Sequence, residues 1–209
     1  MTTLEYIYDV LDEKDSGCYY PSTVDIARVI ATFAHSGQFR ENGERYFEHP
    51  SRCAHKVYEL LFPDEQEQGY IVVEDDLLRR GLIELAYLHD VVEDTELTHQ
   101  NIESIFSSYG YGEFFKKYID KPLKLITHNK KDSYDVYIEK VLTNPTASFV
   151  KMVDLMDNLN LFGLKKLGDK EYERAQRYLS YYKKINDNYR FIETIVYTSR
   201  HQSDGYDKQ

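Results

Sequence analysis

The stretch LLRRGLIELAYLHDVVED, residues 77–94, decides the expected fold. Its apolar side chains recur every three or four residues and nearly encircle a helix, which indicates a central, largely buried element. We expect this helix to run without interruption to Asp94. In that case His89 and Glu93 share one face, as do Asp90 and Asp94, because residues four apart are neighbours on a helix. Four ionisable groups then crowd one end of a buried helix.

The rest of the chain has the same helical periodicity, and no alternating β-branched run is long enough to form a sheet. The sequence therefore predicts an all-α protein. Side chains suited to capping helix N-termini are Thr23, Thr98 and Ser133. A long final helix is expected from about Asp169 to Ser199.

The length of 209 residues is typical of one domain. We predict an N-terminal helix and connection over 1–22, the main domain over 23–200 and a flexible tail over 201–209. The acidic stretch 63–76 lacks a core pattern and is predicted to be a mobile loop.

Composition excludes several classes of function. The chain has 36 acidic and 26 basic residues and a net charge of −10, which argues against a nucleic-acid binder. A small phosphorylated substrate stays compatible, since a local basic pocket or a metal can offset the charge. No apolar run approaches the length of a membrane helix, and the N-terminus has no secretory signal pattern. Cys18 and Cys53 form no CxxC, so a reducing cytoplasm fits best. The oligomeric state stays open, and a homo-oligomer is compatible with the sequence.

A second polar motif lies in FVKMVDLMDNL, residues 149–159. Asp154, Asp157 and Asn158 are spaced as one polar stripe on an otherwise apolar helix. A buried carboxylate needs a partner, and a divalent cation is a natural candidate.

A mixed set of imidazoles and carboxylates emerges when these motifs are combined with the histidine of FEHP. Such a set suits Mn, Fe, Co or Zn better than Ca. Its members would be His49, His89, Asp90 and Asp154. Two plainer interpretations stay open: His89 as a hydrogen-bonded core histidine, and Glu93 with Asp94 as the solvated end of a helix.

Three segments resemble a known family in their order and spacing. They are AHSGQFRENGERYFEHP (34–50), LAYLHDVVEDT (85–95) and VKMVDLMDNL (150–159). The pattern resembles the HD superfamily of metal-dependent phosphohydrolases. More closely, it resembles the hydrolase domain of the RelA/SpoT alarmone enzymes and their stand-alone small relatives. The resemblance covers about Val24 to Leu164.

This resemblance implies an HD-domain helical bundle that removes the 3′-pyrophosphate from guanosine tetra- or pentaphosphate. It also implies one bound metal, usually manganese. The implied ligands are His49, His89, Asp90 and Asp154. Glu93 and Asp94 would activate the attacking water. We expect no synthetase domain within these 209 residues.

Substrate contacts are expected mainly from basic and amide side chains. Arg40 stands where the family has its base-stacking arginine, and Asn158 would bond a sugar hydroxyl or a metal-bound water. Arg45 and Lys151 are further candidates for holding phosphates, although each is equally compatible with a solvated surface charge.

Two other functions stay open. One is hydrolysis of another nucleotide or phosphoester, which is favoured by Glu41, Asn42 and Leu161, because these residues depart from the alarmone hydrolase pattern. The other is a non-catalytic nucleotide-binding module, against which the full ligand set and the intact Glu93–Asp94 pair argue.

Overall fold

The computed structural model describes residues 2–15, 20–62, 76–160 and 168–189. Within these ranges the chain is helical, and its β-structure is limited to an isolated bridge between Phe39 and Arg45. The predicted all-α class is confirmed. The helices are α1 (Thr3–Asp15), α2 (Thr23–Ala34), α3 (Glu48–Leu61), α4 (Asp76–Leu88), α5 (Val91–Asp94), α6 (His99–Ser108), α7 (Gly112–Phe114), the π-helical turn η1 (Phe115–Ile119), α8 (Asp120–Ile126), α9 (Tyr134–Val141), α10 (Pro145–Asn158) and α11 (Asp169–Tyr189).

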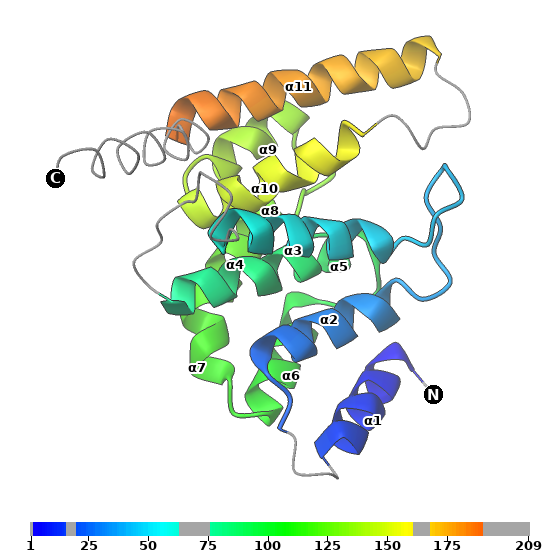
Figure 1. Cartoon of the computed structure of the whole chain (residues 1–209), viewed down its shortest axis with the longest axis vertical. Coiled ribbons are helices and arrows are strands. Elements are labelled where there is room, and N and C mark those ends of the chain that lie inside the picture. The colour runs from blue at the N-terminus through cyan, green and yellow to red at the C-terminus, as the bar shows by residue number, and fades with distance from the viewer. Residues whose placement is uncertain (1, 16–19, 63–75, 161–167, 190–209) are drawn as a thin grey trace, which may run out of the picture.

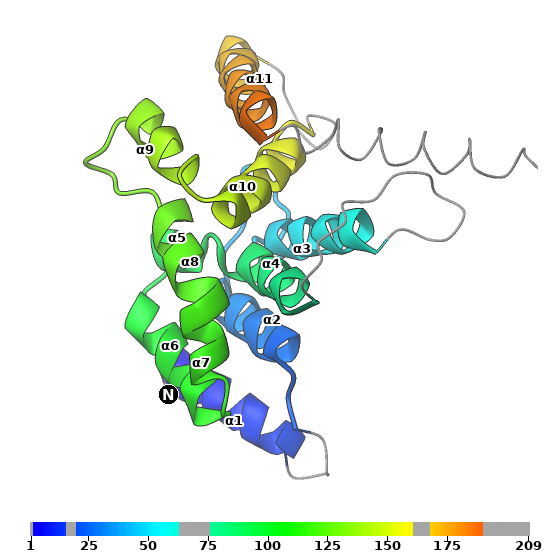
Figure 2. The same ribbon diagram turned by 90° about the vertical axis from the view of Figure 1, so that its left-hand side faces the viewer.

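The helices stack from one end of the molecule to the other. Figures 1 and 2 show α11 lying across one end, above α9 and α10, with α3 and α4 in the middle and α2 and α1 beyond them. Helix α4 packs against α2, α3, α10 and η1, so the predicted central position of this helix is confirmed. Among the described helices, none is long and apolar enough to pass through a bilayer.

Helix N-termini follow the expected capping chemistry with one exception. Thr98 and Ser133 accept hydrogen bonds from backbone N–H groups of the first turn of α6 and α9, as predicted. The prediction for Thr23 was wrong, because Ser22 caps α2 and the Thr23 hydroxyl instead donates to the buried carboxylate of Glu84. The N-cap of α2 lies one residue earlier than predicted because the Thr23 hydroxyl is used in the hydrogen bond to Glu84.

The expectation of one continuous helix to Asp94 was also wrong. Helix α4 ends at Leu88, His89 and Asp90 form a turn, and α5 begins at Val91. Consecutive residues of a regular α-helix diverge by about 100° around its axis. The turn therefore allows His89 and Asp90, which are adjacent in sequence, to face the same point.

Several predicted features lie wholly or partly outside the described residues. They are the tail 201–209, nearly all of the acidic stretch 63–76, Cys18, Leu161 and the last part of the expected final helix. That helix begins at Asp169 as predicted and is described as far as Tyr189.

Candidate metal centre and its cavity

Four side chains from different parts of the sequence converge between α3, α4 and α10. His49 lies in the first turn of α3, His89 and Asp90 in the turn after α4, and Asp154 on α10. His49, His89 and Asp154 are each at most 3% exposed. The structure thus brings together all four residues expected to bind a metal.

The donor atoms face one another. His49 Nε2 lies 3.1 Å from Asp154 Oδ1 and 3.5 Å from Asp90 Oδ2. His89 Nε2 lies 3.3 Å from Asp90 Oδ1 and 3.7 Å from Asp154 Oδ1, and the two Nε2 atoms are 3.3 Å apart. Bonds of about 2.1 Å to a common cation place neighbouring ligand atoms about 3.0–3.4 Å apart. The cluster therefore fits a single divalent ion.

The outward-facing nitrogens of both histidines have partners that fix the rings. His89 Nδ1 donates to the carbonyl oxygen of Ala86 at 2.7 Å, and His49 Nδ1 bonds Asp157 Oδ2 at 2.7 Å. In a neutral ring these contacts keep the proton on Nδ1 and leave Nε2, which faces the cluster, available to bind a metal. Such partners of metal-binding histidines commonly govern metal affinity.

Asp157 is itself held by arginine. Arg52 donates to its two carboxylate oxygens at 2.7 and 2.9 Å and also pairs with Glu44. Burial alone would raise the pKa of Asp157, but His49 and Arg52 outweigh burial and hold this pKa well below its ordinary range. Asp157 is therefore a carboxylate at neutral pH. Sequence reasoning missed Arg52, although its position three residues after His49 places it on the same side of α3.

A sulfur also lies near the histidines. Ligand atoms of His49, Cys53 and His89 lie within 4.8 Å of one another, so this buried trio could hold a metal ion. The sulfur, however, is 3.8 Å from His49 Nδ1, the nitrogen already bonded to Asp157. Burial raises the pKa of the Cys53 thiol, which disfavours the thiolate that a metal requires. The set with Asp90 and Asp154 is therefore the better ligand set.

Asp154 sits in a dense hydrogen-bond network. Lys151 donates to its Oδ2 at 2.6 Å, and Asn158 Nδ2 donates to its Oδ1 at 2.5 Å. Burial favours the neutral acid, yet Lys151 and the two histidines hold the pKa of Asp154 well below its usual value. Lys151, expected to hold phosphates, lines the adjacent cavity but is engaged by a proposed metal ligand.

A cavity of about 550 Å³ opens over this cluster. Of the residues expected to contact substrate, Arg40, Lys151 and Asn158 line it. Arg40 donates to Asp157 Oδ2 at 3.3 Å and to Asn158 Oδ1 at 2.5 Å. Arg45 is exposed and lies outside this lining, so its position gives no support to the expected phosphate contact.

The two acidic residues of α5 occupy different surroundings. Glu93 lines the cavity and accepts a hydrogen bond from the backbone N–H of His128 at 2.9 Å. Burial raises the pKa of Glu93 above its ordinary value. Asp94 lies outside the lining, and its Oδ2 is 2.5 Å from the hydroxyl of Tyr46. The same hydroxyl lies 3.0 Å from Asp90 Oδ2, so Tyr46 links Asp94 to the cluster.

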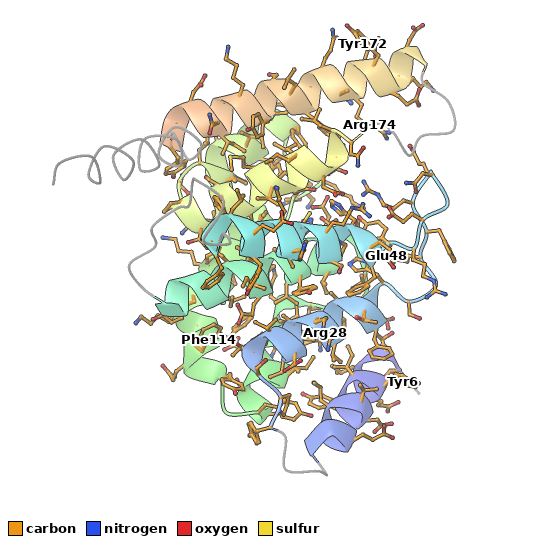
Figure 3. The ribbon with its side chains drawn as sticks, viewed as in Figure 1. Tyr6, Arg28, Glu48, Phe114, Tyr172 and Arg174 are labelled. Atoms are coloured by element: carbon orange, nitrogen blue, oxygen red, sulfur yellow. The ribbon has the colours of Figure 1, made fainter. Side chains whose placement is uncertain are left out.

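The cavity also receives side chains that the sequence analysis did not single out. Arg174 and Tyr178 reach it from α11, and His128 follows α8. The two α11 residues lie one helical turn apart, but only the folded chain shows which side of this largely polar helix covers the cavity. Figure 3 shows Arg174 on the side of α11 that faces the α2–α3 loop.

An all-helical bundle with a His, His-Asp and Asp cluster beneath a cavity is the arrangement expected of an HD-type phosphohydrolase domain. No protein-family model matches the chain. A solved structure described as a metazoan ortholog of SpoT that hydrolyzes ppGpp is similar in fold, with a TM-score of 0.57, 22% identity and coverage of 88% of this chain and 98% of that one.

Curated relatives show the same similarity in sequence. The guanosine-3′,5′-bis(diphosphate) 3′-pyrophosphohydrolase MESH1 of Drosophila melanogaster is 29% identical over 119 residues, which are 56% of this chain and 64% of MESH1. The bifunctional (p)ppGpp synthase/hydrolase SpoT of Escherichia coli is 27% identical over 141 residues, 66% of this chain and 18% of SpoT. The matches thus span less than two thirds of either relative. The predicted resemblance to HD-type (p)ppGpp hydrolases is confirmed.

Proposed function

We propose that this protein is a metal-dependent pyrophosphohydrolase that removes the 3′-pyrophosphate from guanosine 3′,5′-bis(diphosphate). The observation that carries the proposal is the position of His49, His89, Asp90 and Asp154 directly beneath a cavity of nucleotide size. The similarity to MESH1 and SpoT supports the choice of substrate.

We assign the metal to those four residues and propose Mn²⁺ as the ion. Two imidazole nitrogens and two carboxylates form a borderline ligand set that suits such an ion. When bound, the ion would neutralise phosphate oxygens and lower the pKa of a coordinated water. Buried Asp154 contributes its charge at neutral pH, because Lys151 and the histidines keep it ionised.

Proton transfer falls to Glu93 in this proposal. Its carboxylate lines the cavity, and the backbone N–H of His128 fixes its orientation. The raised pKa of Glu93 makes it a better proton acceptor than an ordinary exposed carboxylate. Asp94 does not touch substrate in this proposal. It acts through the Tyr46 hydroxyl, which lies between Asp94 and Asp90, and so orients Asp90 as a metal ligand.

Arg40 is the proposed contact for the guanine base. Its guanidinium is held by Asp157 and Asn158, and a planar guanidinium held in this way is suited to stacking. Tyr134 and Tyr137 also line the cavity, with Lys151 Nζ lying 5.7 and 5.3 Å from their ring centres. We place the protein in the cytoplasm, in keeping with the unpaired thiol of Cys53.

Hydrolysis of another nucleotide or phosphoester is the second candidate. The observation that favours it is the presence of two carboxylates, those of Glu41 and Glu44, in the cavity lining. These groups disfavour a highly charged ligand. A substrate with fewer phosphates would meet less repulsion.

A nucleotide panel separates the two candidates. Purified protein with Mn²⁺ is incubated with guanosine 3′,5′-bis(diphosphate), guanosine di- and triphosphate and simple phosphomonoesters, and the products are identified by ion-exchange chromatography. The proposal predicts guanosine diphosphate and pyrophosphate from the first compound as the preferred reaction. Preferred turnover of another panel member supports the second candidate, and the absence of turnover on all of them contradicts both.

A further inference from the structure

The basic side chains that line the cavity are already paired with carboxylates. Among the described residues, four arginines and lysines line it. Arg40 pairs with Asp157, and Arg52 pairs with both Glu44 and Asp157. Lys151 pairs with Asp154, and Arg174 pairs with Glu41. A polyanionic substrate must therefore compete with the protein's own carboxylates for cations.

The four pairs are not equally easy to separate. Asp157 holds the ring of His49, and Asp154 is itself a proposed metal ligand, so breaking these pairs would disturb the metal centre. Arg174 Nη1 bonds Glu41 Oε2 at 3.0 Å and involves neither group. Of the basic side chains that the structure places in the lining, Arg174 can thus be released without loss to the metal centre.

Glu41 is placed to leave its partner. Its side chain is 73% exposed, whereas that of Arg174 is 33% exposed. Glu41 lies in the α2–α3 loop beside a turn at Gly43, whose φ of 87° is readily accessible to glycine. Arg174 projects from α11, which is fastened to α9 by hydrogen bonds from Tyr181 to Asp135 and from Lys184 to Glu139. The exposed side chain of Glu41 is therefore the member of the pair that can turn away into solvent, while Arg174 stays in place.

We propose that Glu41 is a specificity-determining residue that masks Arg174 until a substrate phosphate displaces it. The proposal rests on the proposed function and names the phosphates concerned: those at the exposed rim, remote from the metal centre and from the bond that breaks. Arg174 then binds such a phosphate, for which a guanidinium provides matched donors. A nucleotide with a phosphate at the rim must separate Glu41 from Arg174 and gains Arg174 in exchange, whereas a nucleotide without such a phosphate leaves the pair intact.

The test measures binding apart from turnover. Guanosine 3′,5′-bis(diphosphate) is titrated calorimetrically into Mn²⁺-loaded protein that carries Glu93→Gln to suppress hydrolysis. Glu41→Gln should tighten binding about two- to fivefold at low salt, the range that exposed ion pairs contribute, and the gain should shrink as salt screens the charges. Guanosine 3′-diphosphate, which lacks the 5′ phosphates, should show no gain.

Matched variants identify the partner. Glu48→Gln removes a carboxylate on the side of the molecule where the α2–α3 loop lies but outside the cavity lining, and it should leave the dissociation constant unchanged (Figure 3). The gain from Glu41→Gln should disappear when Arg174→Gln is also present and persist when the exposed Arg177 is replaced by Gln.

Two results would overturn the inference. One is an unchanged dissociation constant in Glu41→Gln. The other is an equal gain with and without Arg174, which would mean that Glu41 repels substrate directly. Failure of the proposed function is distinct: if the variants bind the nucleotide in the predicted pattern but wild-type protein does not hydrolyse it, the proposed function fails and the masking by Glu41 stands. Absence of nucleotide binding contradicts both.

Discussion

Asp157 offers a sharp test of how the protein holds its metal, because it touches no ligand atom that faces the ion. Its Oδ2 lies 2.7 Å from His49 Nδ1, while both of its oxygens accept hydrogen bonds from Arg52. In Asp157→Asn, the single amide oxygen can accept a hydrogen bond from either His49 or Arg52. The amide N–H₂ group then faces the N–H donor of the residue that is left without an acceptor. Because His49 is only 2% exposed, water cannot readily replace the lost partner.

The expected loss follows from the kind of hydrogen bond removed. A hydrogen bond to a charged group contributes about 1.5–3 kcal/mol, and loss of a histidine-orienting partner typically lowers metal affinity about 10- to 100-fold. We predict a decrease of this size in Mn²⁺ affinity for Asp157→Asn, measured by competition with a fluorescent chelator after circular dichroism has verified the fold. Asp169→Asn, at the exposed start of α11, is the matched control and should bind as wild type does. Affinity within twofold of wild type in Asp157→Asn would show that Asp157 does not support metal binding through His49.

Three further predictions follow from the same centre. His89→Ala and Asp90→Asn should each lose both bound metal and activity, and full metal occupancy by elemental analysis in either variant would remove that residue from the ligand set. Glu93→Gln should keep its metal while turnover falls by about 10²- to 10⁴-fold, the usual contribution of general acid–base catalysis, and wild-type turnover would show that Glu93 is not the base. Removing the metal with a chelator should lower the melting temperature by about 5–10 °C relative to protein in Mn²⁺ at 100 times its dissociation constant, because binding at that excess contributes about 2.7 kcal/mol to stability; an unchanged calorimetric transition would argue against a buried metal site.

The sequence predicts the helical class, and it also singles out the four polar residues that the fold brings together, because both signals depend on local patterns. The apolar periodicity of residues 77–88 reports a buried helix, and the polar stripe of Asp154, Asp157 and Asn158 stands out against apolar neighbours on α10. Such signals can be read from the sequence alone, since each residue is compared only with neighbours three or four positions away.

Other features depend on contacts between distant segments and could not be predicted in this way. The helix break at His89 and Asp90 is not visible in the apolar periodicity that continues through Val91. Arg174 reaches the cavity only because α11 folds back over α10, as Figure 2 shows. Likewise, the sequence shows only that Glu41 departs from the family pattern. Its ion pair with Arg174, 133 residues away, is visible only in the folded chain.

The most direct test of the metal centre is anomalous X-ray diffraction from crystals of the protein grown with Mn²⁺. We expect one strong anomalous peak at bonding distance from Nε2 of His49, Nε2 of His89 and carboxylate oxygens of Asp90 and Asp154. A peak bonded to the sulfur of Cys53, or a peak elsewhere with no metal bound to these four side chains, would contradict the assigned ligand set.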